Sequence, residues 1–280
     1  MLHDDFEIAG GSVTGRAHTL IGKSNQDACT WFRGEDCLIA LVADGCGSGK
    51  RSEVGAELGA RLLTWRLAQA VPGHVAKGGS LDAPALWEEA RAALLTELDR
   101  LVRAMGGSRG EVVSEYFLFT VVGLCVAGEQ ACVFSAGDGV FAVNGEVHEL
   151  GPFPRNEPPY LAYGLLDAES TSGLAPRFVV NRVLPRSRVD SVLLGTDGAG
   201  DLQREAARQL PGGGGEVGPL CQFWRDDAYF QNRDAIRRRL SLINREVVKP
   251  VWPERRLAKE RGLLEDDTTI VVVRRRKLAA

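Results

Sequence analysis

The chain has 280 residues, of which 44% are apolar and 25% charged, as is typical of soluble globular proteins, so the disordered, collagen-like and fibrous classes are excluded. Its 34 basic and 37 acidic residues give a net charge of -3, which leaves no overall basic field to attract nucleic acid. The length allows one large domain or two small ones, and no linker composition marks a boundary between domains.

The sequence predicts a cytoplasmic protein that is neither secreted nor membrane-spanning. No segment approaches the run of about 18 apolar residues that can span a bilayer. The first eight residues contain His3, Asp4, Asp5 and Glu7 instead of a basic and then apolar leader. Six cysteines include no C-x-x-C pair, and most lie in apolar segments, which favours buried free thiols over zinc ligands or disulfides.

The first half of the chain predicts one buried strand and two helices. The apolar segment 38–43 is typical of a buried strand that ends in a turn at Asp44-Gly45. Ser52 begins a helix that we expect to reach about Val71 and to end at Pro72-Gly73. A second helix is expected to be capped by Asp82 and ended by Gly106-Gly107. Its predicted buried stripe consists of Trp87, Ala90, Leu94, Leu98, Leu101 and Met105.

The second half predicts mostly strands. Segments 116–127, 131–143 and 146–150 are expected to form an antiparallel meander, with a hairpin turn at Asn144-Gly145. Later segments are predicted as a surface loop or flap (151–176), strands (177–184, 191–195 and 268–273), a broken helix (203–262) and a solvated basic tail (274–277). Because strands and helices come in blocks, the sequence favours antiparallel sheets flanked by helices.

Acidic residues occur where several predicted strands begin or end. Asp44, Asp138 and Asp197 each precede glycine beside an apolar segment, and Asp266 lies in an acidic cluster before the last strand. One Asp-Gly pair is usually a turn, but buried carboxylates are costly to desolvate unless a cation or donor compensates them. If these strands are neighbours, their ends offer the oxygen ligands that magnesium and manganese prefer, and such a centre activates water for hydrolysis.

Five motifs occur in an order that resembles the metal-dependent type 2C (PPM) serine/threonine protein phosphatases, above all the bacterial branch, over about residues 10–275. They are Asn25-Gln26-Asp27-Ala28, the segment 42–49 with Asp44-Gly45, Ala136-Gly137-Asp138-Gly139, the segment 195–201 with Asp197 and Asp201, and the segment 266–273 with Asp266. The resemblance implies an α+β fold, a four-layer αββα sandwich of two antiparallel sheets flanked by helices. It also implies a single phosphatase-like domain over residues 1–280, with the 151–176 segment as a flap or insertion.

The resemblance implies a centre of two or three divalent cations, manganese or magnesium. Asp44 would bridge two metals, the Gly45 carbonyl would hold one, and Asp197 and Asp266 would complete the other. Asp138 and Asp201 match the positions of a third metal, and Asp27 would act through a metal-bound water. A bridging water would then attack the phosphorus of phosphoserine or phosphothreonine without a phosphoenzyme. The expected partner is a phosphorylated protein, such as a cognate serine/threonine kinase or its targets.

The chain departs from the family pattern at three positions. Gln26 stands where many members carry Glu, and Gly22 where they carry the phosphate-binding Arg. His18, Lys23 and Arg51 are the candidates to replace that arginine, although Lys lacks its bidentate geometry. Cys46 occupies the place of a general-acid His in eukaryotic relatives. We interpret Cys46 as a packing residue and leave protonation of the leaving group to water or His18.

Two other functions compete with the phosphatase. A catalytically impaired pseudophosphatase that binds phosphoproteins is favoured by Gln26 and the missing Arg, but opposed by the retained carboxylates. A phosphate-binding P-loop at 45–50 is excluded, because Asp44 and Arg51 stand where that motif needs Gly and Ser or Thr.

Overall fold

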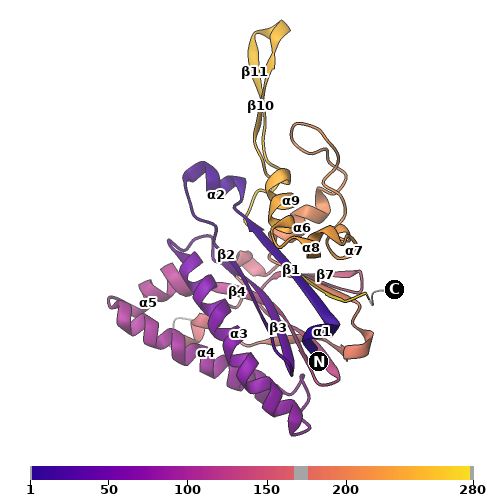
Figure 1. Ribbon diagram of the computed structural model, residues 1–280. Coiled ribbons are helices and arrows are strands. Elements are labelled where there is room, and N and C mark those ends of the chain that lie inside the picture. The colour runs from indigo at the N-terminus through magenta and orange to yellow at the C-terminus, as the bar shows by residue number, and fades with distance from the viewer. Residues whose placement is uncertain (1, 167–175, 278–280) are drawn as a thin grey trace.

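The computed structural model describes residues 2–166 and 176–277. Two five-stranded antiparallel sheets pack face to face, and helices cover their outer faces (Figure 1). The predicted α+β sandwich is confirmed.

The first sheet has the order β2-β3-β4-β5-β8 and the second has the order β1-β12-β9-β6-β7. The strands of the first sheet are β2 (Asp27–Arg33), β3 (Cys37–Gly45), β4 (Phe119–Ala127), β5 (Gln130–Ala136) and β8 (Val179–Pro185). Those of the second sheet are β1 (Phe6–Val13), β12 (Thr268–Arg275), β9 (Ser191–Gly195), β6 (Gly139–Val143) and β7 (Glu146–Leu150). Strand β3 is an unbroken apolar run because both of its faces are buried: Leu38 and Val42 face the second sheet, while Ile39 and Leu41 face the helices.

Helices α3 (Ser52–Ala76) and α4 (Pro84–Met105) cover the first sheet, and the helices of residues 198–243 cover the second (Figure 1). The latter are α6 (Gly198–Arg204), α7 (Gln222–Arg225), α8 (Ala228–Gln231) and α9 (Ala235–Ile243). The remaining short helical segments are α1 (Leu2–Asp5), α2 (Arg16–Ile21), α5 (Arg109–Val112), η1 (Val113–Phe117), η2 (Pro154–Asn156), η3 (Leu161–Leu165), η5 (Arg186–Arg188) and η6 (Trp252–Glu254).

The two long helices differ from prediction in detail. Helix α3 continues through Pro72 to Ala76 instead of ending there. Pro72 has no N–H to donate to the carbonyl of Ala68. The Cys37 thiol lies 3.9 Å from that carbonyl oxygen and takes the place of the missing donor. In α4, Leu101 is only half-buried and Met105 is exposed. Asp82 does not cap this helix, whose N-cap residue is Ala83.

The predicted strand 131–143 is two strands that belong to different sheets. Strand β5 ends at Ala136 in the first sheet and β6 begins at Gly139 in the second, so the expected meander is two hairpins. Gly137 and Gly139 have φ values of 94° and 137°, which favour glycine. The crossing leaves Asp138 between the sheets at one end of the sandwich.

The predicted helix over 203–262 is wrong for its last part. Residues 247–260 form the hairpin β10 (Val247–Val251) and β11 (Arg256–Glu260), which projects from the body in Figure 1. Val247, Val248 and Val251 are β-branched and Pro250 interrupts any helix, so local preference here favours strand.

The segment 274–277, which was predicted to be a solvated basic tail, is not solvated throughout. Arg274 lies in β12 and is buried, with Nε 2.6 Å from Glu7, Nη2 2.8 Å from Asp227 and its guanidinium over the ring of Phe230. This pairing joins the second sheet to α8.

All six cysteines are free thiols, and Cys37, Cys125 and Cys132 are buried. Over residues 2–166 and 176–277, no helix has both the length and the apolar character needed to cross a membrane.

Candidate metal centre

Five carboxylates from five chain segments meet at one end of the sandwich. Asp27 and Asp44 are opposite each other in the β2–β3 register. Asp197 follows β9, Asp266 precedes β12, and Asp138 lies at the crossing from β5 to β6. Each of the other four acts electrostatically on Asp44, which places their charges close to it.

Burial and mutual repulsion raise the pKa values of Asp27, Asp44 and Asp197. Burial raises the pKa of Asp44 well above its ordinary value, and the charges of the other four carboxylates raise it further. Burial likewise raises the pKa of Asp27, against hydrogen bonds from Thr269 and Thr196 that lower it. The pKa of Asp197 rises to about 6, first through burial and then through the charges of Asp266 and Asp138.

The residues suit a hard divalent cation. Asp27 Oδ1 is buried and has no hydrogen-bond partner, so a lone pair is left without a donor. Among the described residues, no Lys or Arg forms an ion pair with Asp27, Asp44, Asp138, Asp197 or Asp266. Carboxylate oxygens, together with the backbone carbonyl of Gly45, are the donor type that magnesium and manganese select.

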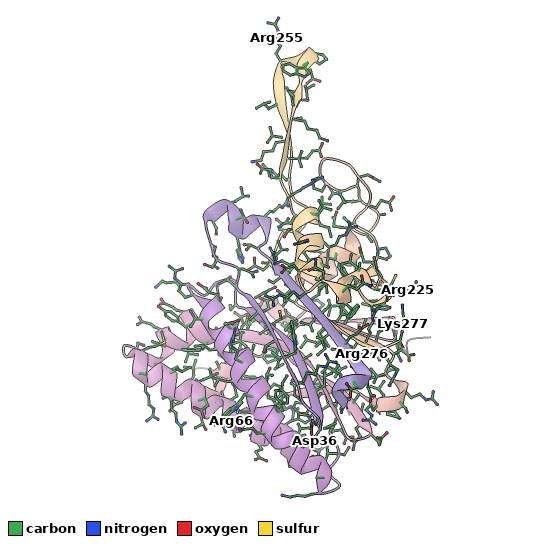
Figure 2. The ribbon with its side chains drawn as sticks, viewed as in Figure 1. Asp36, Arg66, Arg225, Arg255, Arg276 and Lys277 are labelled. Carbon is green, nitrogen blue, oxygen red and sulfur yellow. The ribbon has the colours of Figure 1, made fainter. Side chains whose placement is uncertain are left out.

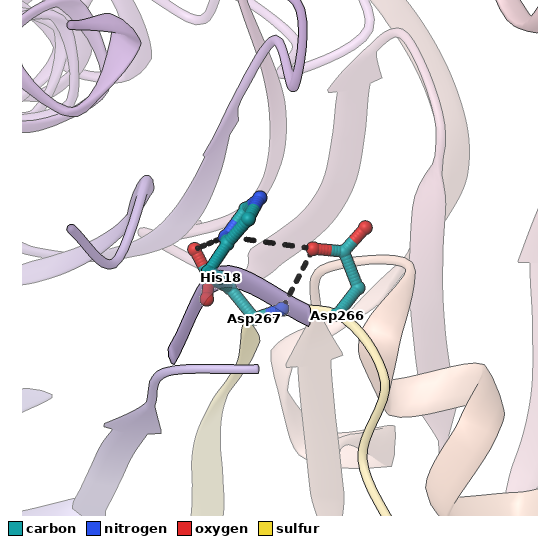
Figure 3. A group of neighbouring side chains, drawn as sticks. All are labelled: His18, Asp266 and Asp267. Atoms are coloured by element: carbon teal, nitrogen blue, oxygen red, sulfur yellow. Dashed lines mark hydrogen bonds and ion pairs between the residues drawn. The ribbon is translucent and has the colours of Figure 1, made fainter. Parts of the chain in front are cut away.

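Asp267 fixes the segment that carries Asp266. Its Oδ1 accepts the N–H of Gly15 at 2.7 Å and its Oδ2 accepts the N–H of Gln26 at 2.5 Å. His18 Nδ1 lies 2.9 Å from Asp267 Oδ2 and 3.9 Å from Asp266 Oδ1 (Figure 3). One buried carboxylate thus connects α2, the start of β2 and the loop before β12.

His18, Asp266 and Asp267 could also hold a metal by themselves, since one ligand atom of each lies within 4.8 Å of the others. Because both oxygens of Asp267 already accept backbone N–H groups, we interpret this group as a structural bracket for Asp266.

Gln26 points toward the loop that follows β3. Its side chain is buried, and its amide nitrogen donates to Ser52 Oγ and to the carbonyl of Gly49 at 3.3 Å. Ser52 Oγ in turn donates to the Cys46 carbonyl at 2.9 Å. The neutral amide therefore ties the loop after Asp44 to the start of α3.

The other predicted residues lie around the centre in different ways. Asp201 lies one turn into α6 and pairs with Arg204 at 2.7 Å, and its charge is not among those that shift the pKa of Asp44. Lys23 Nζ donates to the Gly47 carbonyl at 2.5 Å, beside the loop after Asp44. Arg51 is largely exposed, with Nη1 3.7 Å from Glu53.

Tyr160 is a neighbour of the centre that the sequence did not indicate. It is buried in the 151–166 segment and hydrogen-bonds with Cys46, and burial raises its pKa well above the ordinary value. Burial alone would raise the pKa of Cys46, but hydrogen bonds from Ser48, Tyr160 and backbone N–H groups outweigh it, and the pKa is lowered. The sequence around Tyr160 contains several prolines and no helical or strand periodicity, so it did not indicate that this side chain would be buried. Residues 167–175 of the predicted flap lie outside the described residues.

A prediction follows from the close approach of α6 to the Asp266 loop. A Cβ on Gly198 would lie 2.2 Å from the backbone oxygen of Asp267. Gly198→Ala is therefore expected to lower the free energy of unfolding by about 1–3 kcal/mol and to weaken divalent-cation binding, because Asp197 and Asp266 must move apart. Urea denaturation and metal titration measure both effects. Gly73→Ala is the control, since no atom lies within 4 Å of that Cβ. Equal stability of the two variants would contradict the prediction.

Comparison with known proteins places the chain in a family. The family model described as "Protein phosphatase 2C" matches residues 14–225. A search of curated proteins gave no match.

Several solved structures share the fold at low identity. One is "PppA, a key regulatory component of T6SS in Pseudomonas aeruginosa", 18% identical over 97% of this chain and 98% of that one, with a TM-score of 0.51. A point mutant of a bacterial serine phosphatase is 13% identical over 97% and 99% of the two chains, with a TM-score of 0.51. The catalytic domain of the phosphatase PstP, in complex with two manganese ions, is 16% identical over 98% and 99%, with a TM-score of 0.47. Since the family model covers most of the chain, this protein belongs to the protein phosphatase 2C family.

Proposed function

We propose that this protein is a metal-dependent phosphatase that hydrolyses phosphoserine and phosphothreonine in proteins. The observation that carries the proposal is the convergence of Asp27, Asp44, Asp138, Asp197 and Asp266, none of which pairs with a Lys or Arg of the described residues, in a member of a phosphatase family. Carboxylates that repel one another inside a folded protein need a compensating charge, and divalent cations supply it.

We assign ligand roles in accord with the resemblance. Asp44 would bridge two cations, the Gly45 carbonyl would bind one, and Asp197 and Asp266 would complete the second. Asp27 would act through a water, and Asp138 and Asp201 would serve a weaker third cation. When bound, manganese or magnesium would lower the pKa of coordinated water and offset charge on the phosphoryl oxygens.

The chain's own residues orient these ligands. The Thr196 hydroxyl donates to Asp27 Oδ2 at 2.8 Å and accepts the Thr269 N–H at 3.1 Å, which fixes Asp27 relative to β9 and β12. The Asp267 carboxylate accepts the backbone N–H groups of Gly15 and Gln26 and thereby holds the loop that carries Asp266. Both ligand carboxylates are thereby positioned before a cation binds, which lowers the cost of ordering the site.

Lys23 is the side chain we assign to the phosphate group. It forms no ion pair within the described residues, and its Nζ contacts the loop after Asp44, whereas His18 contacts Asp267 and Arg51 lies beside Glu53. An ammonium group attracts a phosphoryl oxygen as a point charge, with less geometric selection than the arginine of the family pattern. Water or His18 remains the proposed proton donor to the leaving group.

A divalent-metal series tests the proposal. We expect hydrolysis of p-nitrophenyl phosphate and of phosphoserine and phosphothreonine peptides with manganese or magnesium, and none after chelation. Exclusive cleavage of phosphotyrosine peptides would overturn the substrate class. Phosphopeptide binding without turnover at millimolar manganese would identify a pseudophosphatase instead, which no contact at the site favours.

A further inference from the structure

The hairpin β10–β11 has an exposed apolar face that no element of the described residues covers. None of the residues from 245 to 261 is buried, although Val248, Trp252 and Leu257 lie there, with exposed fractions of 51%, 81% and 68%. A two-stranded hairpin is marginal in water unless its apolar face is covered. Large exposed apolar groups gathered on one projecting element are typical of a binding surface.

Val248, Pro250 and Leu257 share one face of the hairpin with Lys259, while Val247, Val251 and Ala258 lie on the other face. Pro250 is opposite Leu257 and Val248 is opposite Lys259 in the register, so these four project to the same side. At the tip, a hollow of about 330 Å³ is lined by Pro250, Val251, Trp252, Arg255, Arg256 and Leu257.

The charge of this hollow indicates which kind of peptide segment would bind there. Its lining contains two arginines and no acidic residue. Arg256 is paired with Glu254, whereas Arg255 forms no ion pair with any described residue and points away from the tip in Figure 2. An apolar surface with an unmatched guanidinium complements a segment in which acidic and large apolar residues alternate.

The partner lies across the face and does not extend the sheet. Pro250 has no N–H to offer, and both strands of this two-stranded sheet are edge strands that carry Lys249, Arg256 and Lys259, which opposes addition of a further strand. Side-chain contacts on the face are therefore the means of recognition.

The hairpin leads directly into the proposed centre. Leu257 and Asp266 are nine residues apart, so their Cα atoms are separated by at most about 30 Å of chain. A substrate segment on the hairpin could therefore place a phosphorylated residue some ten extended residues away at the carboxylates. The hairpin lies outside the matched span of residues 14–225.

We propose that the Trp252–Leu257 face of this hairpin is a docking surface for an extended acidic and apolar segment of the phosphoprotein substrate. The proposal rests on the proposed function for its substrate, but its binding step can be measured without turnover.

The binding test uses a fluorescein-labelled, unphosphorylated peptide in which Glu and Asp alternate with Leu and Phe, measured by fluorescence polarisation on the full chain. We expect binding that the double variant Trp252→Ala/Leu257→Ala weakens by about tenfold or more, as for a buried aromatic anchor. Arg255→Glu should also weaken binding and reduce its salt dependence. Trp65→Ala removes a half-exposed tryptophan from α3, away from the hairpin, and should bind as the wild type does.

The kinetic test compares phosphoserine peptides with and without the acidic and apolar segment, joined by a ten-residue spacer. The segment should lower KM for the wild type and not for the double variant, while the rate on p-nitrophenyl phosphate stays the same.

Equal peptide binding by wild type and double variant would overturn the docking surface. So would loss of a dimer in the double variant by sedimentation, or displacement of the peptide by anionic vesicles. Peptide binding without hydrolysis of any phosphate ester would instead refute the phosphatase and leave the surface intact.

Discussion

Asp44→Asn is expected to lower kcat for manganese-dependent phosphate-ester hydrolysis by about a thousandfold or more, since it removes the carboxylate toward which the other four converge. The substitution keeps the shape of the side chain. In metal-free buffer it should raise the melting temperature, because one of five mutually repelling charges disappears. A merely damaging substitution would lower it, so the two readouts together separate loss of function from loss of fold.

Asp36→Asn is the matched control. Asp36 is exposed just before β3, at the opposite end of the strand from Asp44 (Figure 2), and neither activity nor melting temperature should change. An Asp44→Asn enzyme that keeps a tenth of the activity, or that manganese still stabilises as it does the wild type, would refute the bridging role of Asp44.

Some features of the centre could be predicted because they are local in sequence. Asp44 lies at the end of an apolar strand, Asp197 follows one and Asp266 precedes one. The ends of a buried strand can be predicted because its apolar run stops there. The sandwich could be predicted because helices and strands occur in blocks. Neither pattern states which strands become neighbours, and the motif resemblance supplied that order.

Other features depend on contacts between distant segments. The crossing at Gly137 and Gly139 places Asp138 between two sheets, but an apolar run from 131 to 143 is equally consistent with one strand. Asp267 bonds to residues more than 240 positions away, and no periodicity reveals such a bracket. Proline ordinarily ends a helix, so the sequence predicts an end at Pro72. The Ala68 carbonyl that Pro72 leaves without a donor is instead contacted by the Cys37 thiol, which belongs to another element.

The hairpin over 247–260 differs from the predicted helix for another reason. Ile236, Leu240 and Ile243 have helical spacing, and the prediction extends that period into a segment whose valines favour strand and whose prolines disfavour helix. Long-range packing does not explain the difference, since none of the hairpin's residues is buried. Local preference alone decides its structure, and it outweighs the period of the preceding helix.

The metal-free protein is expected to become less stable as pH rises from about 4 to 7. The pKa of Asp197 rises from 3.8 to about 6 on folding, and those of Asp27 and Asp44 also rise, so the folded state binds more protons than the unfolded state in this range. The extra stability that these protons give the folded state is complete below the pKa of the unfolded state. It is lost as pH rises through the pKa of the folded state. The atoms packed around Asp197 desolvate its carboxyl group, but part of its surface still reaches solvent, so screening reduces its share and we expect a loss of about 1–2 kcal/mol from it.

Divalent cations should reverse this trend, since they bind the deprotonated carboxylates. At pH 7, manganese at about 100 times its dissociation constant adds about 2.7 kcal/mol to the free energy of unfolding, and the gain should shrink as protons compete at pH 5. Urea denaturation at each pH, with and without manganese, measures both slopes. Asp44→Asn should flatten both and Asp36→Asn neither. Metal-free stability that rises from pH 4 to 7 would mean that the carboxylates do not repel one another, and the case for a shared cation centre would fail with it.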